Sequence, residues 1–157
     1  MGESFDLNRM VVDAKANLSH IEILDKTIHN LSLNGQLNRK TYNGLIRVDD
    51  PNAKASVNGN IDFKTSRLLA DVIADIDHLN LNYFTGSKGN QVIRGKLDAK
   101  LAMTNLNDLD LAATAENLRF TNGAKSYFIP NANVKAYFTA GNRVLEVIAP
   151  GAVNGRI

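Results

Sequence analysis

The feature of this sequence that most constrains its fold is an alternation of apolar and polar residues with a period of two. From Ala53 to Phe63, the odd positions carry Ala, Val, Gly, Ile or Phe, and the even positions carry Lys, Ser, Asn or Asp. Successive side chains of a strand point to opposite faces of a sheet, so this pattern predicts a strand with one apolar and one polar face. The segments that share the pattern are 12–18, 31–37, 42–48, 53–63, 93–103, 109–115, 132–140 and 145–149.

One further segment, Ser66–His78, fits two structures. Ala70, Val72 and Ala74 continue the alternation. Leu69 and Ile73 fall in the other phase, where they match the spacing of a helical stripe. The strands predicted on both sides favour a strand here too, and no other segment reads as a connecting helix.

Short runs of Asn, Asp, Gly and Pro separate the predicted strands, which indicates tight turns. In the run Asp49–Asn52, Pro51 fixes φ for the second position of a turn, and an Asp before it can accept hydrogen bonds from turn amides. Gly86–Asn90 also reads as a hairpin turn. The sequence therefore predicts an all-β fold of long antiparallel strands that meander.

Four units of the form apolar-polar-Gly-polar-apolar are centred on Gly35, Gly59, Gly95 and Gly155. Each glycine occupies the apolar phase, where it usually marks a bulge, a bend or a close approach of two backbones. Many alanines share this phase. The pattern predicts a strongly curved sheet with an apolar interior. The alternative is a tightly packed sandwich whose second sheet carries the large residues.

Composition excludes several functional classes. The chain has no cysteine, so disulfides, thiol catalysis and Cys-ligated zinc are excluded. Its 18 Lys and Arg residues are scattered and nearly balanced by 16 Asp and Glu, so we expect no nucleic-acid partner. No apolar run approaches the roughly 18 residues of a membrane span, and no signal peptide is visible.

Candidate catalytic and metal-binding residues are few. Asp49, Asp50 and Asp62 could bind a hard cation, but the first two read as part of a turn and Asp62 as a solvated residue on the polar side of a strand. Gly86–Gly89 lacks the spacing of a phosphate loop. The histidines show no metal-ligand spacing and read as three unrelated residues; they are His20, His29 and His78. We therefore expect no enzyme, no metal and no cofactor.

The remaining feature is collective, because the predicted strands together form one long apolar face. In a closed sandwich that face is only a core. In a partly open sheet it would be a groove for acyl chains, since contiguous exposed apolar surface usually marks an interaction site. The residues expected to face such a groove are Val57, Ile61, Phe63, Leu68, Val72, Ile76, Ile93, Leu97, Leu101, Met103, Leu111, Val134, Phe138 and Leu145.

Three runs of the sequence, Leu31–Gly35, Tyr42–Asn52 and Val57–Phe63, resemble the repeat units of TamB-type proteins, which are related to the AsmA-like group. The same repeat pattern continues through Ala70–Val72 and Leu79–Leu81. The resemblance implies an envelope protein of bacteria with two membranes. It also implies an N-terminal helix in the inner membrane and a long β region that crosses the periplasm as a taco-like sheet with an apolar interior.

The resemblance implies that residues 1–157 are a single β domain and a fragment of that periplasmic β region. The inner-membrane anchor of the longer protein would then lie outside this chain. The implied function is non-enzymatic. The fragment would shield and conduct phospholipid acyl chains between the inner and outer membranes, and would act with an outer-membrane barrel assembly protein in outer-membrane biogenesis. The alternative is a structural or adhesin segment built as a closed β-sandwich or solenoid. Edge-to-edge self-association of the fragment is also expected, because a cut sheet exposes an unpaired edge.

Overall fold

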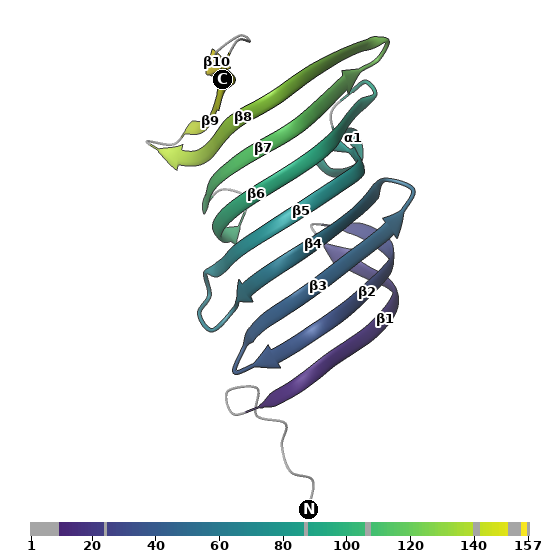
Figure 1. Ribbon diagram of the computed structural model, residues 1–157, viewed down its shortest axis with the longest axis vertical. Coiled ribbons are helices and arrows are strands. Elements are labelled where there is room, and N and C mark those ends of the chain that lie inside the picture. Colours follow the sequence, from purple (N-terminus) through teal and green to yellow (C-terminus); the bar gives the residue numbers. More distant parts are fainter. Residues whose placement is uncertain are drawn as a thin grey trace, which may run out of the picture.

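The computed structural model describes residues 10–23, 25–86, 88–105, 108–139, 142–150 and 155–156. These residues form ten β-strands and one short helix (Figure 1). The elements are β1 (Val11–Ile23), β2 (Lys26–Asn38), β3 (Thr41–Asp50), β4 (Ala53–Asp62), β5 (Leu68–Asn80), α1 (Leu81–Thr85), β6 (Gln91–Asn105), β7 (Asp108–Asn122), β8 (Lys125–Thr139), β9 (Asn142–Ile148) and β10 (Gly155–Arg156). Most of the last glycine unit, at 153–157, lies outside the described residues.

All ten strands belong to one antiparallel sheet, whose spatial order from β1 to β10 is the order of the sequence (Figure 1). Each strand therefore pairs with its neighbours in the chain. This confirms the predicted all-β meander. The ambiguous segment Ser66–His78 lies largely in β5, so its interpretation as a strand is also confirmed.

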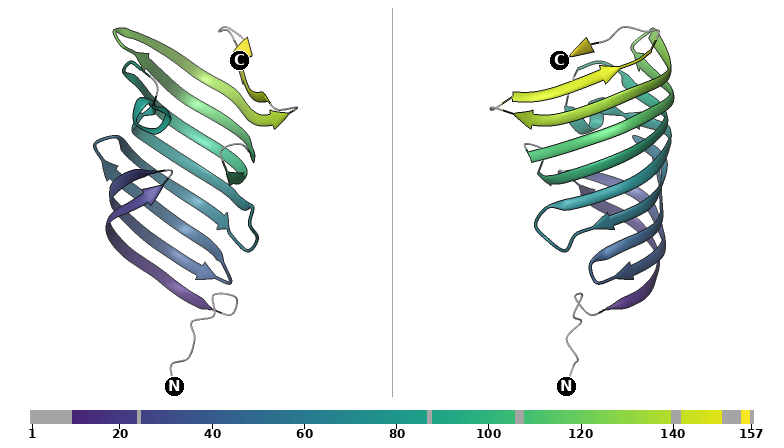
Figure 2. Two further views of the ribbon diagram at one scale, coloured as in Figure 1. Left: turned by 180° about the vertical axis from the view of Figure 1, so that it is seen from behind. Right: turned by 60° about the vertical axis from the view of Figure 1, so that its left-hand side comes forward.

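The sheet is twisted and bent along its strands, but it is neither closed nor strongly curled (Figure 2). The strongly curved, taco-like form expected from the sequence is thus not reached by the described residues. The pairing also leaves the sheet open. Every strand bonds to its chain neighbours, β1 and β10 are the two outer strands, and no ladder joins them.

Glycines of three adjacent strands lie opposite one another. Gly35, Gly44 and Gly59 are register partners in β2, β3 and β4. A Cβ added to Gly35 would lie 2.3 Å from the carbonyl oxygen of Asn43, and one added to Gly59 would lie 2.2 Å from that of Asp71. No side chain fits at either position, which confirms the close approach predicted for these glycines.

Register shifts occur in three strands, β5, β6 and β7, at positions that the sequence analysis did not predict. In β2, Ile28 and Leu31 are both buried although they lie three positions apart; Asn30 between them has a left-handed φ of 52°, while the register with β1 is not shifted. Asn117 in β7 has the same φ, and the register of β5 shifts within residues 76–79. A bulge adds one residue to a strand and returns the next apolar residue to the same face.

The link between β5 and β6 corrects the expectation that no helix connects the strands. The predicted hairpin turn, of which residue 87 lies outside the described residues, is preceded by the single-turn helix α1. The Asn80 side chain accepts a hydrogen bond from the backbone N–H of Asn82 at its start. Gly86, with φ of 70°, donates its N–H to the Asn82 carbonyl at its end. These are standard helix-capping contacts.

The described residues form a single layer without a second sheet, and none of their large side chains is fully buried. The most buried cluster is small and consists of Ala115, Ala132 and Ala149. The sandwich with a tightly packed second sheet is therefore not formed within the part of the chain that the structure describes. Among the same residues, no helix has the length and apolar character needed to cross a membrane.

Candidate functional site

The register of the sheet joins the apolar residues of successive strands into continuous rows. Opposed residues on neighbouring strands keep the same face, so each row crosses the sheet from strand to strand. One row contains Tyr42, Ile61, Ala70, Leu101, Leu111 and Ala136. The next contain Gly59, Val72, Ala99, Ala113 and Val134, and then Val57, Ala74, Leu97, Ala115 and Ala132. We call the side of the sheet that carries these rows the apolar face.

Most residues expected from the sequence to face a groove lie on this apolar face, as the register shows. They are Val57, Ile61, Leu68, Val72, Ile76, Ile93, Leu97, Leu101, Met103, Leu111 and Val134. Phe138 follows in the same phase of β8, and Phe63 comes directly after β4; both rings are more exposed, at 42% and 37%. The backbone of Leu145 pairs with Ala136, but its side chain lies outside the described residues.

Burial distinguishes the two faces clearly in β5. The residues of β5 on the apolar face, from Leu68 to Ile76, are half-buried, whereas the alternate residues are exposed. The two apolar residues out of phase, Leu69 and Ile73, lie on the polar face with 49% and 44% of their surface exposed. Side chains on the apolar face therefore shelter one another along the rows, but no layer of the described chain covers them.

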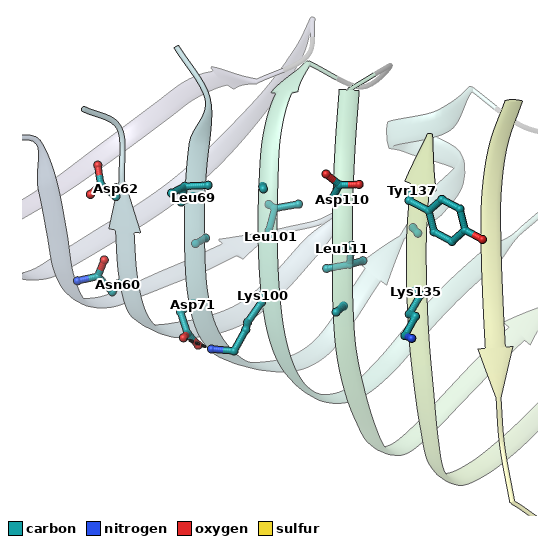
Figure 3. Close-up of a pocket in the computed structure, with 14 residues that line it drawn as sticks. Asn60, Asp62, Leu69, Asp71, Lys100, Leu101, Asp110, Leu111, Lys135 and Tyr137 are labelled. Carbon is teal, nitrogen blue, oxygen red and sulfur yellow. Dashed lines mark hydrogen bonds and ion pairs between the residues drawn. The ribbon is translucent and has the colours of Figure 1, made fainter. Parts of the chain in front are cut away.

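The opposite, polar face has an open depression of about 730 Å³ over β4 to β8 (Figure 3). Its border includes Leu69 and Tyr137 together with charged residues, and Lys100 forms an ion pair with Asp71 on the neighbouring strand. The hydrogen bond and charge of Asp71 raise the pKa of Lys100. The charge of Lys100 is thus paired across two strands, and the depression combines charged side chains with apolar residues such as Leu69 and Leu101.

Asp50 serves the turn between β3 and β4, as the sequence predicted. Its carboxylate accepts hydrogen bonds from the backbone N–H of Asn52 at 2.7 Å and of His29 at 2.9 Å. Its Oδ2 also lies 2.9 Å from Nδ1 of His29. Burial alone would raise the pKa of Asp50, but these hydrogen bonds outweigh it and lower the pKa. The Asp50 carboxylate thus holds β2 against the turn between β3 and β4.

The other carboxylates of this region are also paired. Asp49 forms an ion pair with Lys54, and Asp62 accepts hydrogen bonds from both the backbone N–H and Nζ of Lys64 at 2.9 Å. The Lys64 amide is the main cause of the lowered pKa of Asp62. Asp62 lies on the polar face as predicted, but it is half-buried against Lys64 rather than simply solvated.

The histidines are not all independent of one another, which corrects the sequence interpretation. His20 and His29 are direct register partners in the β1–β2 hairpin, whereas His78 pairs with Lys54. Ser19 Oγ lies 3.1 Å from Nδ1 of His20. Even so, within the described ranges no three His, Cys, Asp or Glu side chains gather as a metal site.

Sequence reasoning missed a contact that joins the tip of the β1–β2 hairpin to α1. The Tyr83 hydroxyl donates a hydrogen bond to the carbonyl oxygen of Thr27 at 2.9 Å, and Nζ of Lys26 lies 5.5 Å from the centre of the Tyr83 ring. The hairpin tip and α1 lie on the same side of the sheet, behind the strands in Figure 1 and before them in the left view of Figure 2. Apolar residues three apart, at Ile28 and Leu31, are the sequence signal of the irregular backbone at Asn30 in this hairpin.

No protein-family model, no curated protein and no solved structure matches this chain.

Proposed function

We propose that this chain is a non-enzymatic segment of a lipid conduit, in which the apolar face shields phospholipid acyl chains from water. The observation that carries this proposal is the set of unbroken apolar rows, which cross β3 to β8 without a charged residue. No second layer of the described residues covers them. A face of this kind favours an apolar occupant, because the half-buried side chains in these rows, such as Leu97 and Leu101, otherwise meet water.

The energetics favour sliding of acyl chains along the apolar face rather than tight capture at one position. Each buried CH₂ group of a lipid contributes about 0.8 kcal/mol. In β5 to β7 the rows offer mainly Ala, Val, Leu and Ile side chains, with no polar side chain to anchor a headgroup. A uniform lining of this kind holds a chain equally well at successive positions along a row.

In this proposal the chain belongs to the periplasmic β region of a TamB-type protein, anchored to the inner membrane through a segment outside this chain. The longer protein would act between the inner and outer membranes with an outer-membrane barrel assembly protein. The apolar face is then an open surface that neighbouring segments extend.

Site-specific photo-crosslinking tests this proposal directly. A photoreactive residue at Leu97 lies on the apolar face, whereas one at Lys96, its neighbour in β6, lies on the polar face. We expect phospholipid adducts from position 97 and none from position 96. Adducts to protein alone at position 97 would instead favour the structural alternative, in which the face is only a packing surface.

A transport assay in the full-length protein provides a second test. Leu97→Arg or Leu101→Arg places a charge in the middle of a row, so we expect lipid transport to be lost. Asp98→Arg is the matched control, because it places the same side chain on the polar face of the same strand. Normal transport by a folded Leu97→Arg protein would count against the conduit.

A further inference from the structure

We propose that a second depression on the polar face binds a phosphate group that carries hydroxyl groups, such as glycerol phosphate or a sugar phosphate. This depression has a volume of about 540 Å³ and lies over β2, β3 and β4, beside the turn that joins β2 to β3. We call it the amide depression. The site lies on the face opposite the proposed conduit and does not depend on that function. Every residue that lines it has a polar side chain; they are Gln36, Asn38, Arg39, Thr41, Asn43, Asn60 and Lys64.

The register of the sheet places three carboxamides side by side in the amide depression. Gln36 pairs with Asn43, and Asn43 pairs with Asn60. Among the residues that the structure describes, none of these three side chains has a hydrogen-bond partner in the protein. A carboxamide offers two N–H donors and one carbonyl acceptor, so a row of carboxamides matches neighbouring hydroxyl groups, which also donate and accept. The row therefore favours a ligand with several hydroxyls.

The polar face is composed differently over β5 and β6. There the register places opposite charges against each other, as in Asp71 with Lys100 and Asp75 with Lys96. Opposite charges on neighbouring strands stabilise each other. The row of carboxamides has no such internal partners, which distinguishes the amide depression from that part of the polar face.

Two cations from distant parts of the chain line the amide depression. The backbone N–H of Phe63 donates a hydrogen bond to the carbonyl oxygen of Lys40 at 3.0 Å. This bond brings Lys64 beside the turn that carries Arg39. Nζ of Lys64 already lies 2.9 Å from Oδ2 of Asp62. Arg39 forms no ion pair with any described residue, so its positive charge is left for a ligand.

The phosphate is assigned to Arg39, because a guanidinium binds phosphate through two parallel N–H···O bonds. None of the described Asp and Glu residues lines the amide depression. Asp13 and Asp71 flank the row of carboxamides in the register, and Asp71 is already paired with Lys100. The excess of N–H donors over carboxylates therefore favours an anion over a cation or a neutral sugar.

An NMR titration of the chain tests the site, because the side-chain N–H signals of Asn and Gln report on the carboxamides directly. We expect glycerol 3-phosphate to shift the signals of Gln36, Asn43 and Asn60 in a saturable way. Inorganic phosphate carries no hydroxylated chain to reach the carboxamides, so it should bind about tenfold more weakly. Absence of saturable shifts with glycerol 3-phosphate, or equal binding of inorganic phosphate, would overturn the proposal.

Substitutions test the assignment of the phosphate. Arg39→Gln should lower the affinity for glycerol 3-phosphate about tenfold or more. Arg39→Lys keeps the charge but loses the second parallel bond, so it should recover only part of that affinity. Arg47→Gln is the matched control, because Arg47 lies on the polar face of β3 without lining the amide depression. Equal affinities of the Arg39→Gln and Arg47→Gln variants would contradict the assignment.

Vesicles distinguish a free ligand from a lipid headgroup, because phosphatidylglycerol presents the same glycerol phosphate group at a membrane surface. Binding to phosphatidylglycerol vesicles that free glycerol 3-phosphate displaces, and that Arg39→Gln weakens, would assign the site to a headgroup. Binding of free glycerol 3-phosphate without such vesicle binding would assign it to a soluble phosphate. Failure of both probes would overturn the site and leave the conduit unaffected, since the conduit uses the other face.

Discussion

At the scale of single residues, Gly59 shows how the absence of a side chain determines the path of two strands. Its φ of 152° is one that side chains rarely adopt, and a Cβ would meet the backbone of β5 at 2.2 Å. We expect Gly59→Ala to lower the free energy of unfolding by about 2–4 kcal/mol, since backbone strain and overpacking add. Urea denaturation measures this loss.

Gly123 provides the control for that experiment. It also has a positive φ, of 59°, but nothing lies within 4 Å of an added Cβ. Gly123→Ala should therefore show the conformational cost alone, about 1–2 kcal/mol. Equal losses for the two variants would mean that the close approach of β4 and β5 contributes nothing.

Asp50 predicts how stability depends on pH. Its pKa in the folded protein is lowered below the unfolded value of about 3.9. The resulting stabilisation is therefore complete above the unfolded pKa and is lost as the pH falls through the folded pKa. We expect Asp50→Asn to cost about 1–3 kcal/mol at pH 7. The difference from wild type should shrink as urea titrations are repeated from pH 5 down to pH 3, and a difference that is constant with pH would contradict this account.

Some of these residue roles could be predicted from the sequence and others could not. The turn at Asp50 and Pro51 is a local feature, so neighbouring residues were enough to predict it. The contact between Asp50 and His29 joins positions 21 apart. No local pattern carries such a contact, because it exists only once β2 and β3 are in register.

At the scale of elements, the bond from Tyr83 to Thr27 holds the hairpin tip against α1. Tyr83→Phe removes only the hydroxyl, so we expect a local loss of about 1 kcal/mol. Amide exchange in the tip, around Thr27 and Ile28, should accelerate roughly fivefold. The matched control is Tyr127→Phe, at a half-exposed ring in β8. Unchanged exchange in the tip of the Tyr83 variant would show that the hairpin is held by other contacts.

The strands themselves were the most predictable elements, because alternation records which face of each strand is apolar. The bulges were missed for the same reason. A period of two, applied strictly, treats Leu79 and Leu118 as the start of new segments. The structure instead returns both to the face of Ile76 and Ala115 after an inserted residue. Apolar residues three apart inside a long strand could have indicated these bulges.

At the scale of the whole molecule, each described strand pairs only with its neighbours in the chain. In such an array the terminal strands unfold more readily than the central ones, as in repeat proteins. We expect native-state hydrogen exchange to be slowest in β5 to β7 and faster in β1 and β9. Uniform protection across the described strands would indicate a single cooperative unit and would contradict this expectation.

The overall shape was predicted only in part. The meander follows from strands and short turns, both visible in the sequence. How far the sheet curls depends on the sum of small rotations between strands, and residues such as Gly35 and Gly59 show where bending is permitted without determining its total. The alternation pattern shows which face of each strand is apolar. It does not show which molecule or segment contacts that face.

Because the strands lie in the order of the sequence, two dimensions of the apolar face are set independently. The width of the apolar face is the length of a strand, whereas its extent across the sheet is the number of strands added in sequence. Inserting or deleting one hairpin would then lengthen or shorten the surface without altering its cross-section. A gene encoding such a sheet could match the distance it must cover by duplicating short segments, with each new hairpin facing the same way as the last.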